Sequence, residues 1–142
     1  METYIVIIYV DKDTKINVGS LGDVGFSKGY YLYIGSGGVN TLKRISRHYR
    51  IGKRIRWHID YLTNFYPAIE SYIIKNKDID ECTLSLYMAE NGFKYIKGFG
   101  STDKKSPSHL FYFESRRELE KALKFLSHKM QLIKVDSVID LI

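Results

Sequence analysis

The sequence predicts an α/β (α+β) fold in which a small central, mainly antiparallel sheet of three to five strands is flanked by helices. Residues 4–10 and 30–34 are runs of aromatic and branched side chains, which are typical of strands. Residues 40–50 and 115–127 carry apolar side chains at helical spacing. Because the 142 residues contain no repeat, low-complexity segment or linker, we expect a single domain over residues 1–142.

The first half of the chain predicts a hairpin followed by a helix. Residues 4–10 are apolar at almost every position, as expected for a strand covered on both faces. Residues 16–18 predict a short strand, and residues 19–29 a glycine-rich connection that lacks the Lys and Ser/Thr of a phosphate-binding P-loop. Residues 30–34 are expected to pair antiparallel with the first strand, and glycines then form the turn into the helix.

The second half of the chain predicts three further strands and three further helices. Asp78 or Asp80 can cap the second long helix, whose apolar face would contain Cys82, Leu86 and Ala89. The predicted strands lie at 68–74, 95–99 and 109–113, and the predicted long helices at about 81–91 and 115–127. Residues 57–64 predict a short helix or turn. The tail at 130–142 predicts either a strand plus a short helix or a homodimer contact.

Composition indicates a polyanionic partner. The net charge is +6 and the pI about 9.3, which fits a nucleic-acid backbone, although a basic surface can also serve solubility alone. The single cysteine, Cys82, cannot form an intramolecular disulfide, in agreement with a reducing cytoplasm. No apolar run reaches membrane-spanning length, and the first strand is too short for a signal peptide. We therefore expect a cytoplasmic protein with no membrane partner.

A strand, a glycine turn and a cationic helix together indicate phosphate chemistry. Arg44, Arg47 and His48 recur at i, i+3 and i+4, so they are expected to share one helix face. Arginine is always charged, and its planar fork of donors matches phosphate oxygens. The alternative is a solvated basic helix beside an ordinary strand. The opposite, apolar face would consist of Leu42, Ile45 and Tyr49.

A second cationic segment follows this helix. Its four basic residues could cradle a nucleic-acid backbone, or they could form a solvated linker between helices. His58 is a candidate contact to phosphate or water, and it lies two positions from Asp60, so the two cannot share a helix face. The four residues are Arg50, Lys53, Arg54 and Arg56.

Four short motifs occur in a characteristic order. They are YIGS at 33–36 followed by LKR at 42–44 and RH at 47–48, then WHIDYL at 57–62, FGSTD at 99–103 and SHLF at 108–111. In this order they resemble the GIY-YIG nuclease superfamily, and within it the Uri-type branch, a small prokaryotic domain sometimes fused to endonuclease III-like repair enzymes. The resemblance covers a core of about residues 2–113 and leaves a C-terminal helix and tail at 114–142.

In the region of the first two signatures, the chain departs from the superfamily pattern at two points. The first signature of these proteins is Gly-Ile-Tyr, whereas this chain has Glu-Thr-Tyr, so that only Tyr4 matches. The spacing from Gly35 to Arg44 is about one residue longer than in the commonest members.

The resemblance implies a metal-dependent endonuclease that hydrolyses DNA phosphodiester bonds in repair or processing. Tyr4 and Tyr33 would be the general base and the hydroxyl that orients the phosphate. Arg44 would stabilise transition-state charge, and His48 would polarise or share the proton of a tyrosine hydroxyl. Arg47 would hold a flanking phosphate of DNA, or of RNA or branched DNA.

The resemblance also implies one divalent cation, Mg²⁺ or Mn²⁺, held by a glutamate on the helix after the third strand. Glu81 is the candidate ligand, and Glu90 lies too far along the helix to join it. The alternative role for Glu81 is an acidic first-turn residue favoured by the helix dipole. Two other functions stay open: a non-catalytic nucleic-acid binding module on a nuclease fold, and an interaction protein whose basic face meets an acidic partner.

Overall fold

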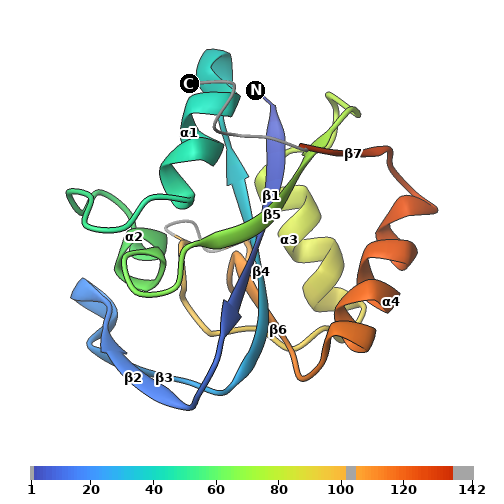
Figure 1. Cartoon of the computed structure of the whole chain (residues 1–142). Coiled ribbons are helices and arrows are strands. Elements are labelled where there is room, and N and C mark those ends of the chain that lie inside the picture. The colour runs from blue at the N-terminus through green and yellow to red at the C-terminus, as the bar shows by residue number, and fades with distance from the viewer. Residues whose placement is uncertain (1, 102–104, 136–142) are drawn as a thin grey trace.

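The centre of the molecule is a five-stranded, fully antiparallel sheet with the strand order β6-β4-β1-β5-β7 (Figure 1). The computed structural model describes residues 2–101 and 105–135. This architecture confirms the predicted α+β class and the hairpin pairing of the first long strand with the strand at 30–34. The strands are β1 (Thr3–Val10), β4 (Gly29–Ser36), β5 (Ala68–Ile74), β6 (Leu110–Phe113) and β7 (Leu132–Lys134).

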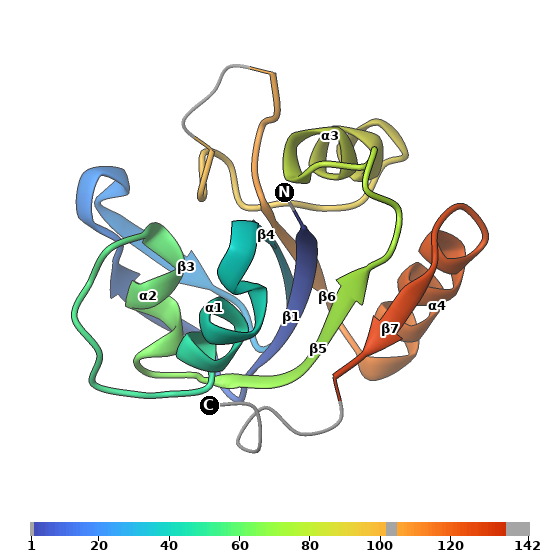
Figure 2. The same cartoon turned by 90° about the horizontal axis from the view of Figure 1, so that it is seen from above.

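Helices cover both faces of this sheet, as Figure 2 shows from above. On one face, Ile45 of α1 and Leu62 of α2 pack with the core that includes Tyr4 and Val6. On the other face, α3 and α4 pack with the alternate residues of β1. Because β1 is central and buried on both faces, its sequence is apolar throughout. The helices are α1 (Thr41–His48), α2 (His58–Thr63), α3 (Glu81–Glu90) and α4 (Arg116–Ser127).

The predicted connection at residues 19–29 contains regular structure. Strand β2 (Thr14–Asn17) pairs with β3 (Asp23–Phe26), and the short 3-10 helix η1 (Gly19–Leu21) forms the tip of this hairpin. Phe26 is almost fully buried and packs edge-on against Tyr31 and Phe99. Strand β3 has only four residues, and its two apolar residues, Val24 and Phe26, lie on either side of Gly25. This pattern is too short to predict a strand without the tertiary contacts.

Two predictions about the second half of the chain are wrong. The strand predicted at 95–99 is only a single bridge from Tyr95 to Phe111, because the chain turns at Gly98 and Gly100 with φ of 77° and 71°. The buried face of α3 consists of Leu84, Ser85 and Met88, and the predicted face of Cys82, Leu86 and Ala89 is only half-buried.

The N-termini of α3 and α4 coincide with side-chain caps. Asp80 accepts a hydrogen bond from the Thr83 amide at 2.7 Å, and Ser115 accepts one from the Glu118 amide at 3.2 Å. A short 3-10 helix, η2 (Gly38–Asn40), precedes α1. The tail forms edge strand β7 beside β5, and the helix or dimer segment predicted beyond residue 135 lies outside the described residues. Within the described residues, none of the helices has the length and apolarity needed to cross a membrane.

Candidate active site

Two tyrosines from neighbouring strands lie on the sheet face that α1 covers. The register pairs Tyr4 with Gly35 and Val6 with Tyr33. Because strand side chains alternate between faces, Tyr4 and Tyr33 are diagonal neighbours on the same face. Their exposed fractions are 3% and 8%, so both hydroxyls lie in a largely desolvated environment.

The glycine of the YIG motif provides space for the first tyrosine. A Cβ atom built on Gly35 would lie 2.4 Å from Cζ and 2.5 Å from Oη of Tyr4. The Tyr4 ring therefore crosses directly over the backbone of Gly35, and any side chain at this position would displace it.

His48 is the last residue of α1, and its buried imidazole contacts both tyrosines. Its Nε2 is 2.8 Å from Tyr4 Oη, and its ring centroid is 5.6 Å from that of Tyr4 and 5.8 Å from that of Tyr33. His48 is fully buried beside Ile45, so it does not share an exposed face with Arg44 and Arg47 as the spacing predicted. Burial lowers the pKa of His48 to about 3, although the Asp60 carboxylate opposes this effect.

Either nitrogen of His48 can carry the proton of the neutral ring. Its Nδ1 has no hydrogen-bond partner among the described residues, so nothing there selects one tautomer. Nε2 can therefore accept a proton from Tyr4 or donate one to it.

The charges of Arg44 and Glu81 both influence the pKa of the two tyrosine hydroxyls. Burial raises the pKa of Tyr4 well above its ordinary value; the Tyr33 hydroxyl and the Glu81 carboxylate add to this rise, and the Arg44 guanidinium opposes it. Burial likewise raises the pKa of Tyr33; the Glu81 and Asp60 carboxylates add to this rise, and the Arg44 guanidinium opposes it. Arg44 donates from Nη1 to the Ser36 carbonyl at 2.5 Å, which anchors its exposed guanidinium.

One carboxylate, that of Glu81, has the chemistry of a divalent-cation ligand at the position the resemblance implies. Glu81 is the half-buried first residue of α3, and its charge reaches both tyrosine hydroxyls. No group of three or more His, Cys, Asp or Glu that could hold a metal occurs in the described part of the chain. Mg²⁺ prefers oxygen ligands and retains several waters, so a single protein carboxylate can suffice to hold it. Asp103 of the FGSTD motif lies outside the described residues.

Arg47 is held in an internal ion pair and is not exposed to grip a phosphate. Its Nη2 donates to Asp60 Oδ2 at 2.7 Å, and the side chain of Asp60 is fully buried. The same oxygen accepts hydrogen bonds from the amides of Arg56 at 2.8 Å and Trp57 at 3.1 Å. Burial alone would raise the pKa of Asp60, but these hydrogen bonds keep it below its ordinary value.

Sequence reasoning missed this role of Asp60. The available signal was its place at the third position of α2, where an acidic side chain can bond back to the amide of the residue before the helix. The guanidinium groups of Arg44 and Arg47 both lie over the Trp57 ring, at 5.0 and 5.3 Å from its centroid. Asp60 and Trp57 thus orient the cationic side chains of α1.

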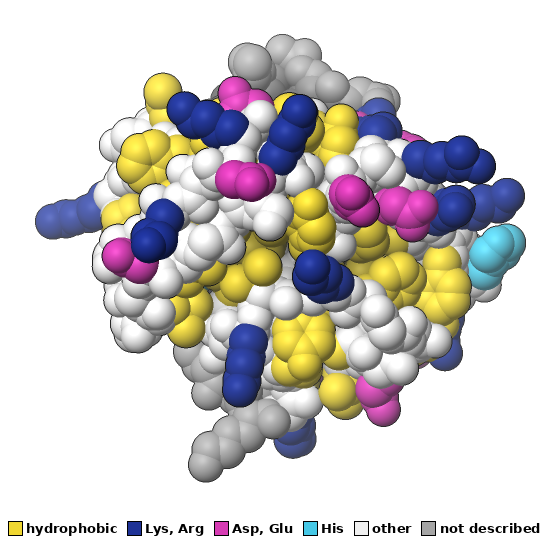
Figure 3. Space-filling model, turned by 90° about the horizontal axis from the view of Figure 1, so that it is seen from below, with side chains coloured by type: hydrophobic (Ala, Val, Ile, Leu, Met, Phe, Trp, Pro, Cys, Tyr) yellow, Lys and Arg dark blue, Asp and Glu magenta, His cyan; other side chains and the backbone are white. Residues whose placement is uncertain are grey.

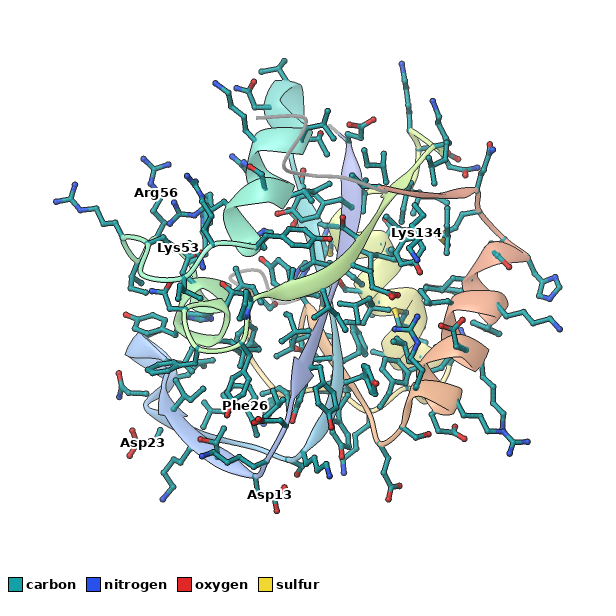
Figure 4. All side chains as sticks on the ribbon, viewed as in Figure 1. Asp13, Asp23, Phe26, Lys53, Arg56 and Lys134 are labelled. Carbon is teal, nitrogen blue, oxygen red and sulfur yellow. The ribbon has the colours of Figure 1, made fainter. Side chains whose placement is uncertain are left out.

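The basic residues between α1 and α2 divide into two kinds. Lys53 donates from Nζ to the Arg50 carbonyl at 2.7 Å and to Asn64 Oδ1 at 3.1 Å, and burial lowers its pKa to about 8. The side chains of Arg50, Arg54 and Arg56 are exposed. Figure 4 shows Lys53 and Arg56 on this loop, with Arg56 on its outer side. Three arginines are therefore accessible to a partner.

Both ring nitrogens of His58 have hydrogen-bond partners within the protein. The Gly100 amide donates to Nδ1 at 3.0 Å, so the proton of the neutral ring resides on Nε2, which lies 3.2 Å from Ser20 Oγ. His58 therefore joins η1, α2 and the segment around Gly100. The predicted contact of His58 to phosphate or water would require one of these hydrogen bonds to break.

We expect the burial of His48 to make the protein sensitive to acid. Its pKa is about 3 when folded and about 6.5 when unfolded, so below pH 6.5 the unfolded chain takes up a proton that the folded protein does not. The free energy of unfolding should fall by about 1.4 kcal/mol per pH unit on this account. In urea titrations between pH 7 and 4.5, His48→Gln should have a flatter profile by this slope.

Burial also lowers the pKa of His58, but both proteins retain this residue. The difference between their two pH profiles therefore reports on His48 alone. Parallel profiles for the wild type and His48→Gln would contradict the assignment of this pH dependence to His48.

Fold and site together define a small α+β protein with a buried tyrosine–histidine pair beside an arginine and a glutamate. A family model described as a domain of unknown function, DUF123, matches residues 3–132, and the chain belongs to this family. No curated protein and no solved structure matches the chain.

Proposed function

We propose that this protein is a metal-dependent endonuclease that hydrolyses DNA phosphodiester bonds in repair or processing. The observation that carries the proposal is the buried contact of 2.8 Å between Tyr4 Oη and His48 Nε2 beside the Tyr33 ring, where the charges of Arg44 and Glu81 influence the pKa of both tyrosines. A cationic donor, a carboxylate and a proton-exchanging pair are the groups that phosphodiester hydrolysis requires. The GIY-YIG resemblance of the motifs points to the same chemistry.

Arg44 is suited to stabilise negative charge that develops on the phosphate. The Ser36 carbonyl and the Trp57 ring hold its guanidinium in place, so little reorganisation is needed when charge appears. Glu81 would hold Mg²⁺ or Mn²⁺ in the same candidate active site. Such an ion, when bound, polarises a phosphoryl oxygen and lowers the pKa of a coordinated water.

Tyr4 and His48 can pass a proton between them. At neutral pH both side chains are neutral, because burial raises the pKa of Tyr4 and lowers that of His48. The negative charge of a bound phosphodiester would favour the imidazolium form of His48, and the Arg44 guanidinium would favour the tyrosinate form of Tyr4. Tyr4 Oη would then give its proton to His48 Nε2 and take one from the attacking water.

The exposed arginines between α1 and α2 would contact the DNA backbone. Arg50, Arg54 and Arg56 lie on the segment that leads from the site to α2. At the other end of the molecule, seen from below in Figure 3, Lys and Arg side chains are interspersed with acidic and apolar ones. The α1–α2 segment is therefore the more favourable surface for a polyanion.

A cleavage assay tests this proposal. We expect plasmid, linear duplex or single-stranded DNA to be cut with Mg²⁺ or Mn²⁺ and to survive in EDTA. Cutting should be lost in Arg44→Ala and in Glu81→Gln. The matched controls, Lys43→Ala and Glu90→Gln, change exposed residues on the same two helices and should keep activity.

The other outcomes separate the rival functions. Salt-sensitive binding of DNA without cutting under every condition would favour a nucleic-acid binding module. Absence of any salt-sensitive binding would favour an interaction protein that uses its basic face for an acidic partner.

A further inference from the structure

A cavity of about 270 Å³ opens beside Tyr33, between the tip of the β2–β3 hairpin and α2. It is smaller than the roughly 300–1,000 Å³ of pockets that take drug-sized ligands. Its lining includes the aromatic side chains of Tyr33, Trp57 and Tyr61, together with Ser20, Ile55 and Arg56.

We propose that this cavity binds one unpaired base of the DNA strand that is cut, next to the scissile phosphate. The proposal rests on the proposed nuclease function and names its substrate class, which is DNA with an unstacked nucleotide such as a single strand or a bulge.

The lining suits a nucleobase. Aromatic rings form stacking surfaces that accept any base, because every base has a π face. The cavity also offers polar groups for the base edges, from the exposed Ser20 hydroxyl and the exposed Arg56 guanidinium. A purely apolar ligand would leave these polar groups unused, and a base pair within a stacked duplex presents no free ring to the cavity.

The position of the cavity links it to the candidate active site. Tyr33 and Trp57 line the cavity; the ring centroid of Tyr33 is 5.8 Å from that of His48, and the Arg44 guanidinium lies 5.0 Å from the centroid of the Trp57 ring. A base in the cavity would therefore place its own phosphate toward these groups. Exposed Arg54 and Arg56 on the α1–α2 segment would accompany the strand as it enters.

The cavity is held open before any ligand arrives. His58 connects two of its walls, because Nδ1 accepts from the Gly100 amide and Nε2 lies 3.2 Å from Ser20 Oγ. A preformed cavity has a lower ordering cost on binding. DNA that already has an unpaired nucleotide avoids the further cost of unstacking a base from the duplex, so such DNA should be preferred.

Binding measurements in EDTA test the proposal without requiring cleavage. The probes are a short duplex with one bulged 2-aminopurine nucleotide and the same duplex with an abasic bulge, which keeps the backbone and removes the base. We expect the protein to bind the first about 5- to 150-fold more tightly and to quench its 2-aminopurine fluorescence. Equal affinity for the two duplexes would overturn the proposal.

Two variants on one loop provide the structural control. Ile55→Trp should fill the cavity and abolish the preference for the bulged base. Ile51→Trp changes an exposed residue of the same loop that does not line the cavity, and it should keep the preference. An unchanged preference in Ile55→Trp would also overturn the proposal. A preference for the bulged base without any metal-dependent cutting would support the cavity assignment while contradicting the nuclease function.

Discussion

Asp60→Asn should lower the free energy of unfolding by about 3–5 kcal/mol, because it breaks a buried ion pair while leaving one charge in place. Asp60 is fully buried, its Oδ2 accepts from Arg47 at 2.7 Å, and the Arg47 side chain is only 16% exposed. The isosteric amide can still accept hydrogen bonds from the Arg56 and Trp57 amides, so the change mainly removes the counter-charge. Urea denaturation at pH 7 measures the effect.

An exposed ion pair provides the comparison for Asp60. Arg116 and Glu120 form an i,i+4 pair at 2.6 Å with side chains that are 40% and 54% exposed, so Glu120→Gln should cost no more than about 1 kcal/mol. The double variant Arg47→Met/Asp60→Asn should be more stable than Asp60→Asn, because no unpaired buried charge remains and the Arg56 and Trp57 amides keep their acceptor. Equal stability of Asp60→Asn and Glu120→Gln would contradict a structural role for the buried pair.

Tyr4→Phe should reduce the rate of metal-dependent DNA cleavage by about 10²- to 10⁴-fold, the usual contribution of a positioned acid–base group. The substitution keeps the ring over Gly35 and removes only the hydroxyl that lies 2.8 Å from His48 Nε2. It should also cost about 1–3 kcal/mol of stability, because the buried imidazole loses its partner. Single-turnover cleavage and urea denaturation separate the two effects.

Tyr31→Phe is the matched control for the loss of a buried hydroxyl. Tyr31 is fully buried on the same face of the sheet, and its hydroxyl donates to the Ser27 carbonyl at 2.8 Å. Removal of the Tyr31 hydroxyl should lower stability by an amount similar to that of Tyr4→Phe and should leave the cleavage rate unchanged. Equal loss of activity in both variants would mean that the effect of Tyr4→Phe is structural.

The predictable parts of the fold are those with strong local signals. The apolar runs of β1 and β5 and the capped, amphipathic α4 were all predicted within one or two residues. Strand β3 was missed, and residues 95–99 were wrongly expected to form a strand, because pairing partners far along the chain decide both segments. The buried face of α3 was also wrong, since the helix packs through Leu84, Ser85 and Met88.

The resemblance of the motifs to GIY-YIG nucleases selected Tyr4, Tyr33, Arg44, His48 and Glu81 as candidate residues. The sequence by itself determined the α+β class, the hairpin and the helices. Spacing along a chain carries this information because strand and helix periods assign side chains to faces. Only the tertiary structure decided that His48 is buried against Tyr4, that Arg47 is paired with Asp60, and that Gly35 makes room for a ring. Those outcomes depend on desolvation and on contacts between strands and helices that are distant in sequence, which no local pattern records.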